Sequence, residues 1–137
     1  MASYQQHLAQ WTHNRSFLSA IAASPRHPDW IITATFYVCL HAVDTLLVHD
    51  GVTGVNSHGT RNFTLAQTNR YANVWKCYRP LHDLSRKVRY LADPSEWVPL
   101  ENIERDIFKR YFYPLERSVV RLLKQNVEFP PIVLAKT

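Results

Sequence analysis

Glycine is the residue that this sequence lacks most clearly. Only Gly51, Gly54 and Gly59 are present in 137 residues, and all three fall in one short stretch. Sandwiches and barrels of many short strands need glycines in turns spread along the chain, so the sequence excludes such folds. The long stretches without glycine favour helices joined by few loops, and we expect an all-α fold.

Cysteine is also scarce, and Cys39 and Cys77 lie far apart. They form neither a CxxC pair nor a Cys/His ligand pattern, and of the seven histidines only His41 and His58 have polar neighbours suited to a metal. The sequence therefore predicts no metal site and no cofactor. Motifs of dinucleotide-binding proteins, P-loop enzymes, zinc proteases and serine hydrolases are absent, which argues against these classes.

No segment is typical of a membrane span or a signal peptide. The longest apolar run, Trp30–Val43, is shorter than the ~20 residues that a span needs, and it contains Thr33, Thr35 and His41. The first ten residues are polar. Unpaired cysteines fit a reducing compartment. We expect a soluble, cytoplasmic protein.

A chain of 16.0 kDa fits a single domain. We expect residues 1–128 to form one helical domain and residues 129–137 to form an extended tail, because Pro130 and Pro131 cannot continue a helix. Apolar residues in this tail could dock it on the domain.

Apolar side chains recur at helical spacing in five segments. Ser3 followed by Gln6 predicts a capping box at the start of the first helix, and Pro25 ends that helix. The other predicted helices are 30–50 capped by Asp29, 61–68 capped by Thr60, 72–91 with a kink near Pro80, and 100–126 with a bend at Pro114. These helices predict an antiparallel bundle of four to five helices.

Positive charge exceeds negative charge by +5, and most of the excess lies in the second half of the chain. Two basic rows at helical spacing carry it: Arg79, Arg86, Lys87 and Arg89 in the first row, and Arg110, Arg117, Arg121 and Lys124 in the second. Such rows could straddle a nucleic-acid backbone through phosphate contacts. They could equally form an ordinary surface that neighbouring acidic residues neutralise.

The helix predicted over 30–50 carries one polar stripe on an otherwise apolar surface. Thr33, Tyr37, His41 and Asp44 are spaced so that they share a face. Buried polar groups need partners, so something polar must meet this stripe. It is either a packing network or part of a ligand site.

The glycine-containing loop ends in a run from Ser57 to Arg61. His58 is expected just before a helix and Arg61 in its first turn. Helix starts attract anions, and an imidazole with a guanidinium would strengthen such a site. The alternative is simple capping beside an exposed arginine.

Several motifs at defined spacing run through residues 7–92. They are His13-Asn14, Phe17-Leu18, Asp29-Trp30-x-x-Thr33-Ala34-x-Phe36-Tyr37-x-x-x-His41, Ser57-His58-x-x-Arg61 and Tyr78-x-x-Leu81-x-x-x-Ser85-Arg86-x-x-Arg89-Tyr90. Together they resemble the HEPN domain (higher eukaryotes and prokaryotes nucleotide-binding domain). The resemblance implies a four- or five-helix bundle that dimerises and acts in toxin–antitoxin, phage-defence or RNA-processing systems.

The resemblance also implies that active members are metal-independent ribonucleases with an Arg-x4–6-His motif. Here the matching region lacks the histidine, and no arginine of the chain precedes a histidine at that distance. We therefore expect a non-catalytic homodimer that binds RNA or a nucleotide. Its expected ligand-binding residues are Tyr37, His41, Asp44, His58, Arg61, Arg86, Arg89 and Tyr90.

Two alternatives stay open. One is a divergent ribonuclease in which His58 or His41 acts as the base and Arg86 or Arg89 stabilises the phosphate, with His58 and Arg86 as the first candidates. The other is a structural partner of a neighbour-encoded protein, such as a nucleotidyltransferase-type antitoxin.

Overall fold

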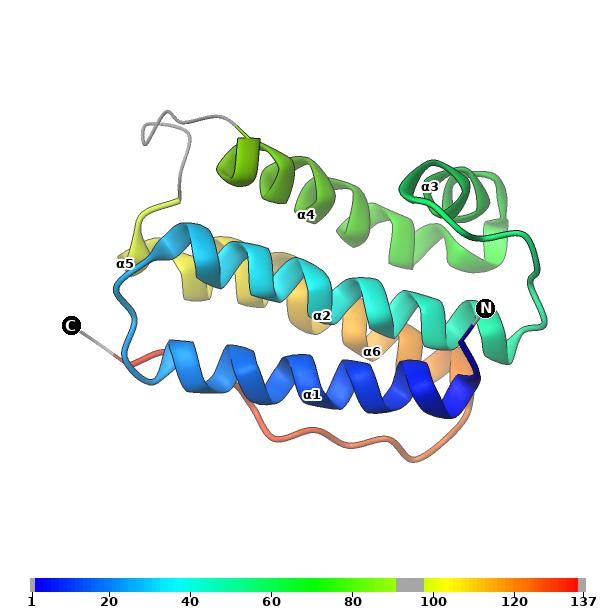
Figure 1. Cartoon of the computed structure of the whole chain (residues 1–137), viewed down its shortest axis with the longest axis horizontal. Helices are drawn as coiled ribbons and strands as arrows, with labels where there is room; N and C mark the ends of the chain where they lie inside the picture. Colours follow the sequence, from blue (N-terminus) through cyan, green and yellow to red (C-terminus); the bar gives the residue numbers. More distant parts are fainter. Residues whose placement is uncertain (1, 91–97, 136–137) are drawn as a thin grey trace.

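Helices account for all regular secondary structure in residues 2–90 and 98–135, which are the residues that the computed structural model describes (Figure 1). Helices α1 (Tyr4–Ala22) and α2 (Pro28–His49) run antiparallel, and α4 (Ala72–Tyr90) runs back along α2. The chain then returns behind α2 and ends in a segment that follows α1. The expected all-α fold is confirmed.

Helix α2 is the centre of the bundle. From Ile31 to Leu47 every residue except Tyr37 and His41 is buried. Three threonines are among these buried residues: Thr33, Thr35 and Thr45. Each hydroxyl donates to the backbone carbonyl four residues earlier, so none of the three is left unpaired in the core. Among the described helices, α2 is long and apolar enough to cross a membrane, and most of it is packed inside the bundle.

The starts of two helices differ from the prediction. The capping box of Ser3 and Gln6 is confirmed, but α2 begins with Pro28 after His27, so Asp29 is not its cap. Proline lacks only an N–H that the first turn leaves unpaired, and its fixed φ suits this position. Asp29 lies in the first turn instead.

Helix α3 (His58–Gln67) begins earlier than predicted. Ser57 is its cap, and Thr60 completes the capping box from inside the first turn. The loop before it needs positive φ at Gly51 and Gly54. This correction makes His58 the first helical residue.

Helix α4 follows a short 3-10 turn, Asn69–Tyr71, and continues through Pro80. The predicted stop at Asp93-Pro94, and most of the linker after it, lie outside the described residues.

The last predicted helix is three consecutive segments: α5 (Leu100–Ile103), a π-helical stretch (Glu104–Phe112) and α6 (Tyr113–Leu123). The Tyr113 N–H donates to the carbonyl of Phe108, five residues back. This wider turn inserts an extra residue immediately before Pro114, whose ring would crowd an α-helical carbonyl.

The buried face of these segments differs from the prediction at two positions. Helical periodicity alone places Tyr111 and Leu122 on the apolar face, yet both are only half-buried, while Phe112 and Leu123 are buried. The helix ends at Leu123, because Lys124 adopts a left-handed conformation with φ 54°. The predicted end at Asn126 is wrong.

The C-terminal segment packs along α1. Arg15 Nη1 donates to the carbonyl of Pro130 at 2.6 Å, and Ile132 is buried. The N–H of Ala135 donates to the carbonyl of Ala22 at 2.9 Å. The extended tail is therefore part of the same core.

Candidate functional site

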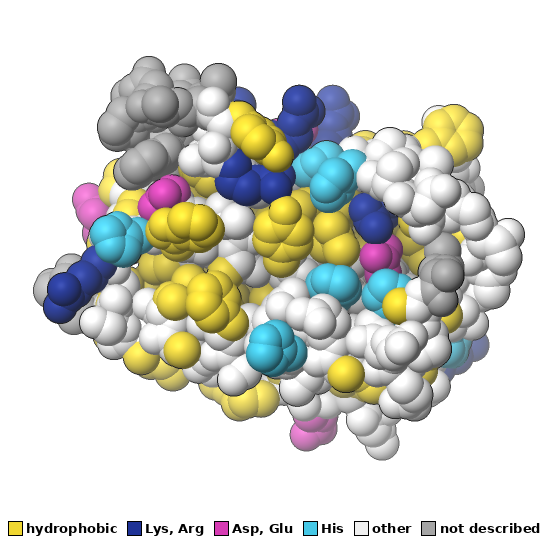
Figure 2. Space-filling view, viewed as in Figure 1, with side chains coloured by type: hydrophobic (Ala, Val, Ile, Leu, Met, Phe, Trp, Pro, Cys, Tyr) yellow, Lys and Arg dark blue, Asp and Glu magenta, His cyan; other side chains and the backbone are white. Residues whose placement is uncertain are grey.

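One face of the bundle gathers most of the predicted site residues. Figure 2 shows Lys and Arg side chains over α4, with histidines beside them and in the middle of the face. Hydrophobic side chains lie toward the end where α2 begins. The face is formed by α1, α2, α3 and α4.

A stack of three rings leads from the core to the surface of this face. The ring of His82, on α4, stacks on buried Phe36 of α2 at 5.1 Å with 11° between planes. On its other side it stacks on His58 at 4.8 Å. His58 is exposed, so we call Phe36, His82 and His58 the ring stack, with its open end at His58.

The two imidazoles of the ring stack have lowered pKa values. Desolvation lowers the pKa of His58 first, and the positive charges of Arg61 and Arg89 lower it further. Desolvation also lowers the pKa of His82, followed by His58 and Arg86. Both rings are therefore neutral at neutral pH and each keeps a nitrogen lone pair, which a general base or a hydrogen-bond acceptor requires.

One buried polar atom beside His82, Asn62 Oδ1, has no hydrogen-bond partner among the described residues. The Tyr78 hydroxyl is also buried; desolvation raises its pKa, and its contact with the Arg61 guanidinium opposes that rise. The Asn62 amide nitrogen lies 3.1 Å from His82 Nδ1, and the Tyr78 ring lies 6.0 Å from the His82 ring. Buried polar groups are nearly always paired in folded proteins, so Asn62 Oδ1 is an exception in this part of the structure.

Arg89 connects α4 to α2 next to the ring stack. Its Nη1 donates to the Tyr37 hydroxyl at 2.8 Å, and its guanidinium lies 5.5 Å and 5.1 Å from the ring centroids of Tyr37 and Tyr90. Tyr90 is 74% exposed, and Arg86 is exposed on the same helix without an ion-pair partner in the described residues. The structure thus combines cationic groups with open aromatic faces.

Arg61 is held differently from the other predicted arginines. Its Nε and Nη2 donate to the two carboxylate oxygens of Asp44 at 2.7 Å and 3.0 Å, and both side chains are buried. This bidentate pair occupies the guanidinium and joins α3 to α2. Arg61 therefore shapes the site and adds positive potential, but it does not present a free fork to a ligand.

The polar stripe of α2 divides among three neighbouring helices. Tyr37 meets Arg89 of α4, and Asp44 meets Arg61 of α3. His41 faces His7 of α1, with their Nδ1 atoms 3.5 Å apart. Burial lowers the pKa of His41, and the charges of His7 and Arg61 add to this effect. The stripe therefore links α2 to the three helices, and its Tyr37 end lies next to the ring stack. We call the surface around the ring stack the ring stack face.

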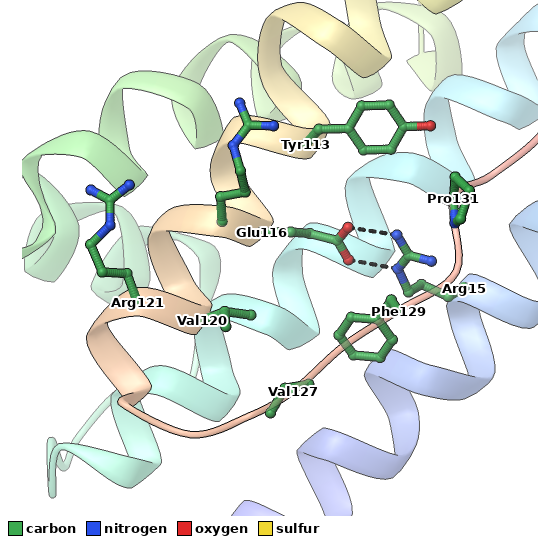
Figure 3. Close-up of a pocket in the computed structure, with 9 residues that line it drawn as sticks. Arg15, Tyr113, Glu116, Val120, Arg121, Val127, Phe129 and Pro131 are labelled. Carbon is green, nitrogen blue, oxygen red and sulfur yellow. Dashed lines mark hydrogen bonds and ion pairs between the residues drawn. The ribbon is translucent and has the colours of Figure 1, made fainter.

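The two predicted basic rows do not border one common groove. Arg117 and Arg121 of α6 line a separate open pocket of about 550 Å³, which the buried Arg15–Glu116 ion pair and the C-terminal segment also line (Figure 3). None of the ring stack residues lines that pocket. The other basic residues outside the face are exposed: Arg79, Arg110 and Lys124. Lys87 is exposed on α4 next to Arg86.

Sequence reasoning missed the polar residues that complete the face. His82 lies four residues before Arg86 and seven before Arg89, so helical spacing places it on the same face of the helix as these arginines. That spacing does not predict the contact of His82 with His58. Asn62 gave no signal, because it reaches His82 only through the packing of α3 on α4. Tyr78 lies one helical turn before His82 on α4, so helical spacing could have placed the two together.

No family model, curated protein or solved structure matches this chain.

Proposed function

We propose that this protein is a helical module that binds single-stranded RNA on the ring stack face. The observation that carries the proposal is the exposed Arg86 and the Tyr-stacked Arg89, together with the exposed side chains of His58 and Tyr90. Arginines supply phosphate contacts, and exposed aromatic rings supply surfaces on which bases stack.

The aromatic residues support a single strand over a duplex. Tyr90 is 74% exposed and Trp30 is 59% exposed, and both lie at the end of the bundle where α4 ends and α2 begins (Figure 1). Unpaired bases stack on such rings, and each stacked base adds about 1–3 kcal/mol. Bases in a duplex are not available for this contact.

The resemblance of residues 7–92 to HEPN domains supports RNA as the ligand. It also supports a cytoplasmic dimer that acts in a defence or toxin–antitoxin system. Exposed aromatic side chains such as Phe17 and Phe63 are available for a protein contact. Light scattering on the purified protein tests the dimer.

A second function is favoured by the neutral histidine pair. His58 could remove the proton of a ribose 2′-hydroxyl, and Arg86 could stabilise the negative charge that develops on the phosphate. The charge of Arg86 already reaches His58, since it adds to the lowered pKa of that imidazole, after desolvation and the charges of Arg61 and Arg89. This is a metal-independent ribonuclease without the usual histidine motif.

One assay separates these functions. Labelled single-stranded RNA is incubated with the full chain in EDTA and run on native and denaturing gels. We expect a mobility shift that Arg86→Ala and Arg89→Ala each weaken about tenfold, because each removes a charge-assisted hydrogen bond. Arg110→Ala removes an equal charge from an exposed position outside the face and serves as the control.

Each outcome has a distinct meaning. A shift without cleavage supports the binding module, and a log–log salt slope of about −0.7 per phosphate would support backbone contacts. Cleavage that His58→Ala abolishes supports the ribonuclease. If the wild type neither shifts nor cleaves RNA, the RNA proposal fails and a protein partner, recovered by pull-down from the native host, takes its place.

A further inference from the structure

A second cluster of ligating groups lies where α1 crosses α2. It contains His7 of α1 and the pair His41 and Asp44 of α2, which are one helical turn apart. One ligand atom from each residue lies within 4.8 Å of the other two. The cluster uses none of the residues of the ring stack, although Asp44 also holds Arg61.

The two histidines are placed in an unusual way for a hydrogen bond. Their Nδ1 atoms face each other at 3.5 Å, beyond the 2.7–3.2 Å range that is usual for strong hydrogen bonds. In a tetrahedral zinc site with Zn–N bonds of about 2.05 Å, two ligand nitrogens lie about 3.3 Å apart. The observed separation is close to that edge length.

We propose that His7, His41 and Asp44 bind one divalent transition-metal ion of the zinc class. Imidazole nitrogens and a carboxylate oxygen are the ligands that zinc accepts in sites with three protein groups. The two Nδ1 atoms are already at a suitable distance, and one ligand atom of each of the three residues, Asp44 included, lies within 4.8 Å of the others.

The surroundings of Asp44 suit this role. A carboxylate has about four lone-pair positions, and Arg61 uses two of them, so Asp44 can hold Arg61 and a metal together. Ligating carboxylates in metal sites are commonly held by such a hydrogen-bonded neighbour.

The structure also leaves room for a fourth ligand. A cavity of about 90 Å³ adjoins the cluster and is lined by Ala2, His7, Asp44, Leu47, Val48 and Val55. One water needs only about 10–15 Å³ of such space. Three protein ligands with an open fourth position are typical of sites where a metal binds water or a small ligand.

The test is a metal titration of the full chain, with any affinity tag removed and bound metal stripped by a chelator. We expect calorimetry with Zn²⁺ to give one site per chain and Co²⁺ to give the visible absorption of a tetrahedral complex. His7→Ala and His41→Gln should each weaken Zn²⁺ binding on the order of 100-fold or more, since removal of a mere supporting group already costs 10–100-fold.

His13→Ala is the matched control, because His13 is an exposed histidine on the same face-forming helix α1. It should bind Zn²⁺ like the wild type. Thermal unfolding gives a second measurement: Zn²⁺ should raise the Tm of the wild type and of His13→Ala but not of His7→Ala. Circular dichroism confirms that each variant is folded.

Equal Zn²⁺ affinity in the wild type and in both ligand variants would overturn the proposal, and so would the absence of a Tm shift in the wild type. If His41→Gln does not fold, the Zn²⁺ affinity of His7→Ala alone tests the proposal. His7 lies at the edge of the core with 9% exposure, so its substitution leaves the centre of the bundle intact. The inference is independent of the RNA proposal, whose assay contains EDTA.

Discussion

His58 and His82 are ordinary residue types in an uncommon environment. Each contacts another aromatic ring on one face, and arginine side chains lie nearby. Desolvation and nearby positive charge both disfavour the protonated imidazole, so the two rings act as neutral polar groups where isolated histidines would be partly charged.

This environment predicts that the protein loses stability on mild acidification. The pKa values of His58 and His82 are lowered in the folded state, so below the ordinary value of about 6.5 the unfolded chain binds more protons than the folded one. The contribution of the neutral His58 and His82 to the free energy of unfolding is therefore complete above a pH of about 6.5, and it is lost as the pH falls below the lowered pKa values. Thermal unfolding at pH 7.5 and pH 5.5 measures the effect.

The double variant His58→Gln/His82→Gln should show a smaller difference in Tm between the two pH values than the wild type. The pKa of His41 is lowered from the same ordinary value, so the double variant should keep part of the pH dependence. The pKa of Asp50 is lowered from 3.8, so its protonation lies below this window. An unchanged pH dependence in the double variant would show that other groups are responsible.

At the scale of elements, the start of α3 determines where the open end of the ring stack lies. The Ser57 hydroxyl accepts the N–H of Thr60 at 3.1 Å, and the Thr60 hydroxyl accepts the N–H of Ser57 at 3.1 Å. This reciprocal capping box begins the helix at His58 and places that side chain over His82.

We predict that Ser57→Ala lowers the free energy of unfolding by about 1 kcal/mol, because it removes a side-chain cap from a helix of only ten residues. Urea unfolding measures the change. Ser16→Ala, at an exposed position within α1, should change the stability by less than about 0.5 kcal/mol. Equal effects of the two substitutions would rule out a special role for the cap.

For the whole molecule, the C-terminal segment closes the bundle from outside the helices. It reaches the buried ion pair through Pro130 and inserts Ile132, which is 4% exposed, into the core. The ion pair itself joins Arg15 of α1 to Glu116 of α6, and the Trp11 indole donates to the same carboxylate. Segments from both ends of the chain therefore depend on one another.

We predict that Ile132→Ala lowers the free energy of unfolding by about 2 kcal/mol, the lower end of the range for a buried isoleucine, since an extended segment can partly close the space. Val133→Ala is the control, because Val133 is 70% exposed. It should change the stability by less than about 0.5 kcal/mol. Denaturant unfolding of both variants decides whether the segment is docked in solution.

The sequence by itself determined the helical fold and most of its elements. Few glycines, the capping pattern at Ser3 and the apolar periodicity of 30–50 are local properties, and local backbone and burial preferences decide them. It also predicted that the stripe with Tyr37 and Asp44 needs polar partners, because unpaired buried groups are costly anywhere in a fold.

Only the tertiary structure decided which groups meet. A π-helical turn precedes Pro114, and helical periodicity assumes that no such turn occurs. Arg61 contacts Asp44, and His7 contacts His41, which lies 34 positions away in the sequence, because the packing of whole helices sets these distances. A spacing rule for one helix contains no information about its neighbour, so the ring stack and the proposed metal ligands could be recognised only in the folded chain.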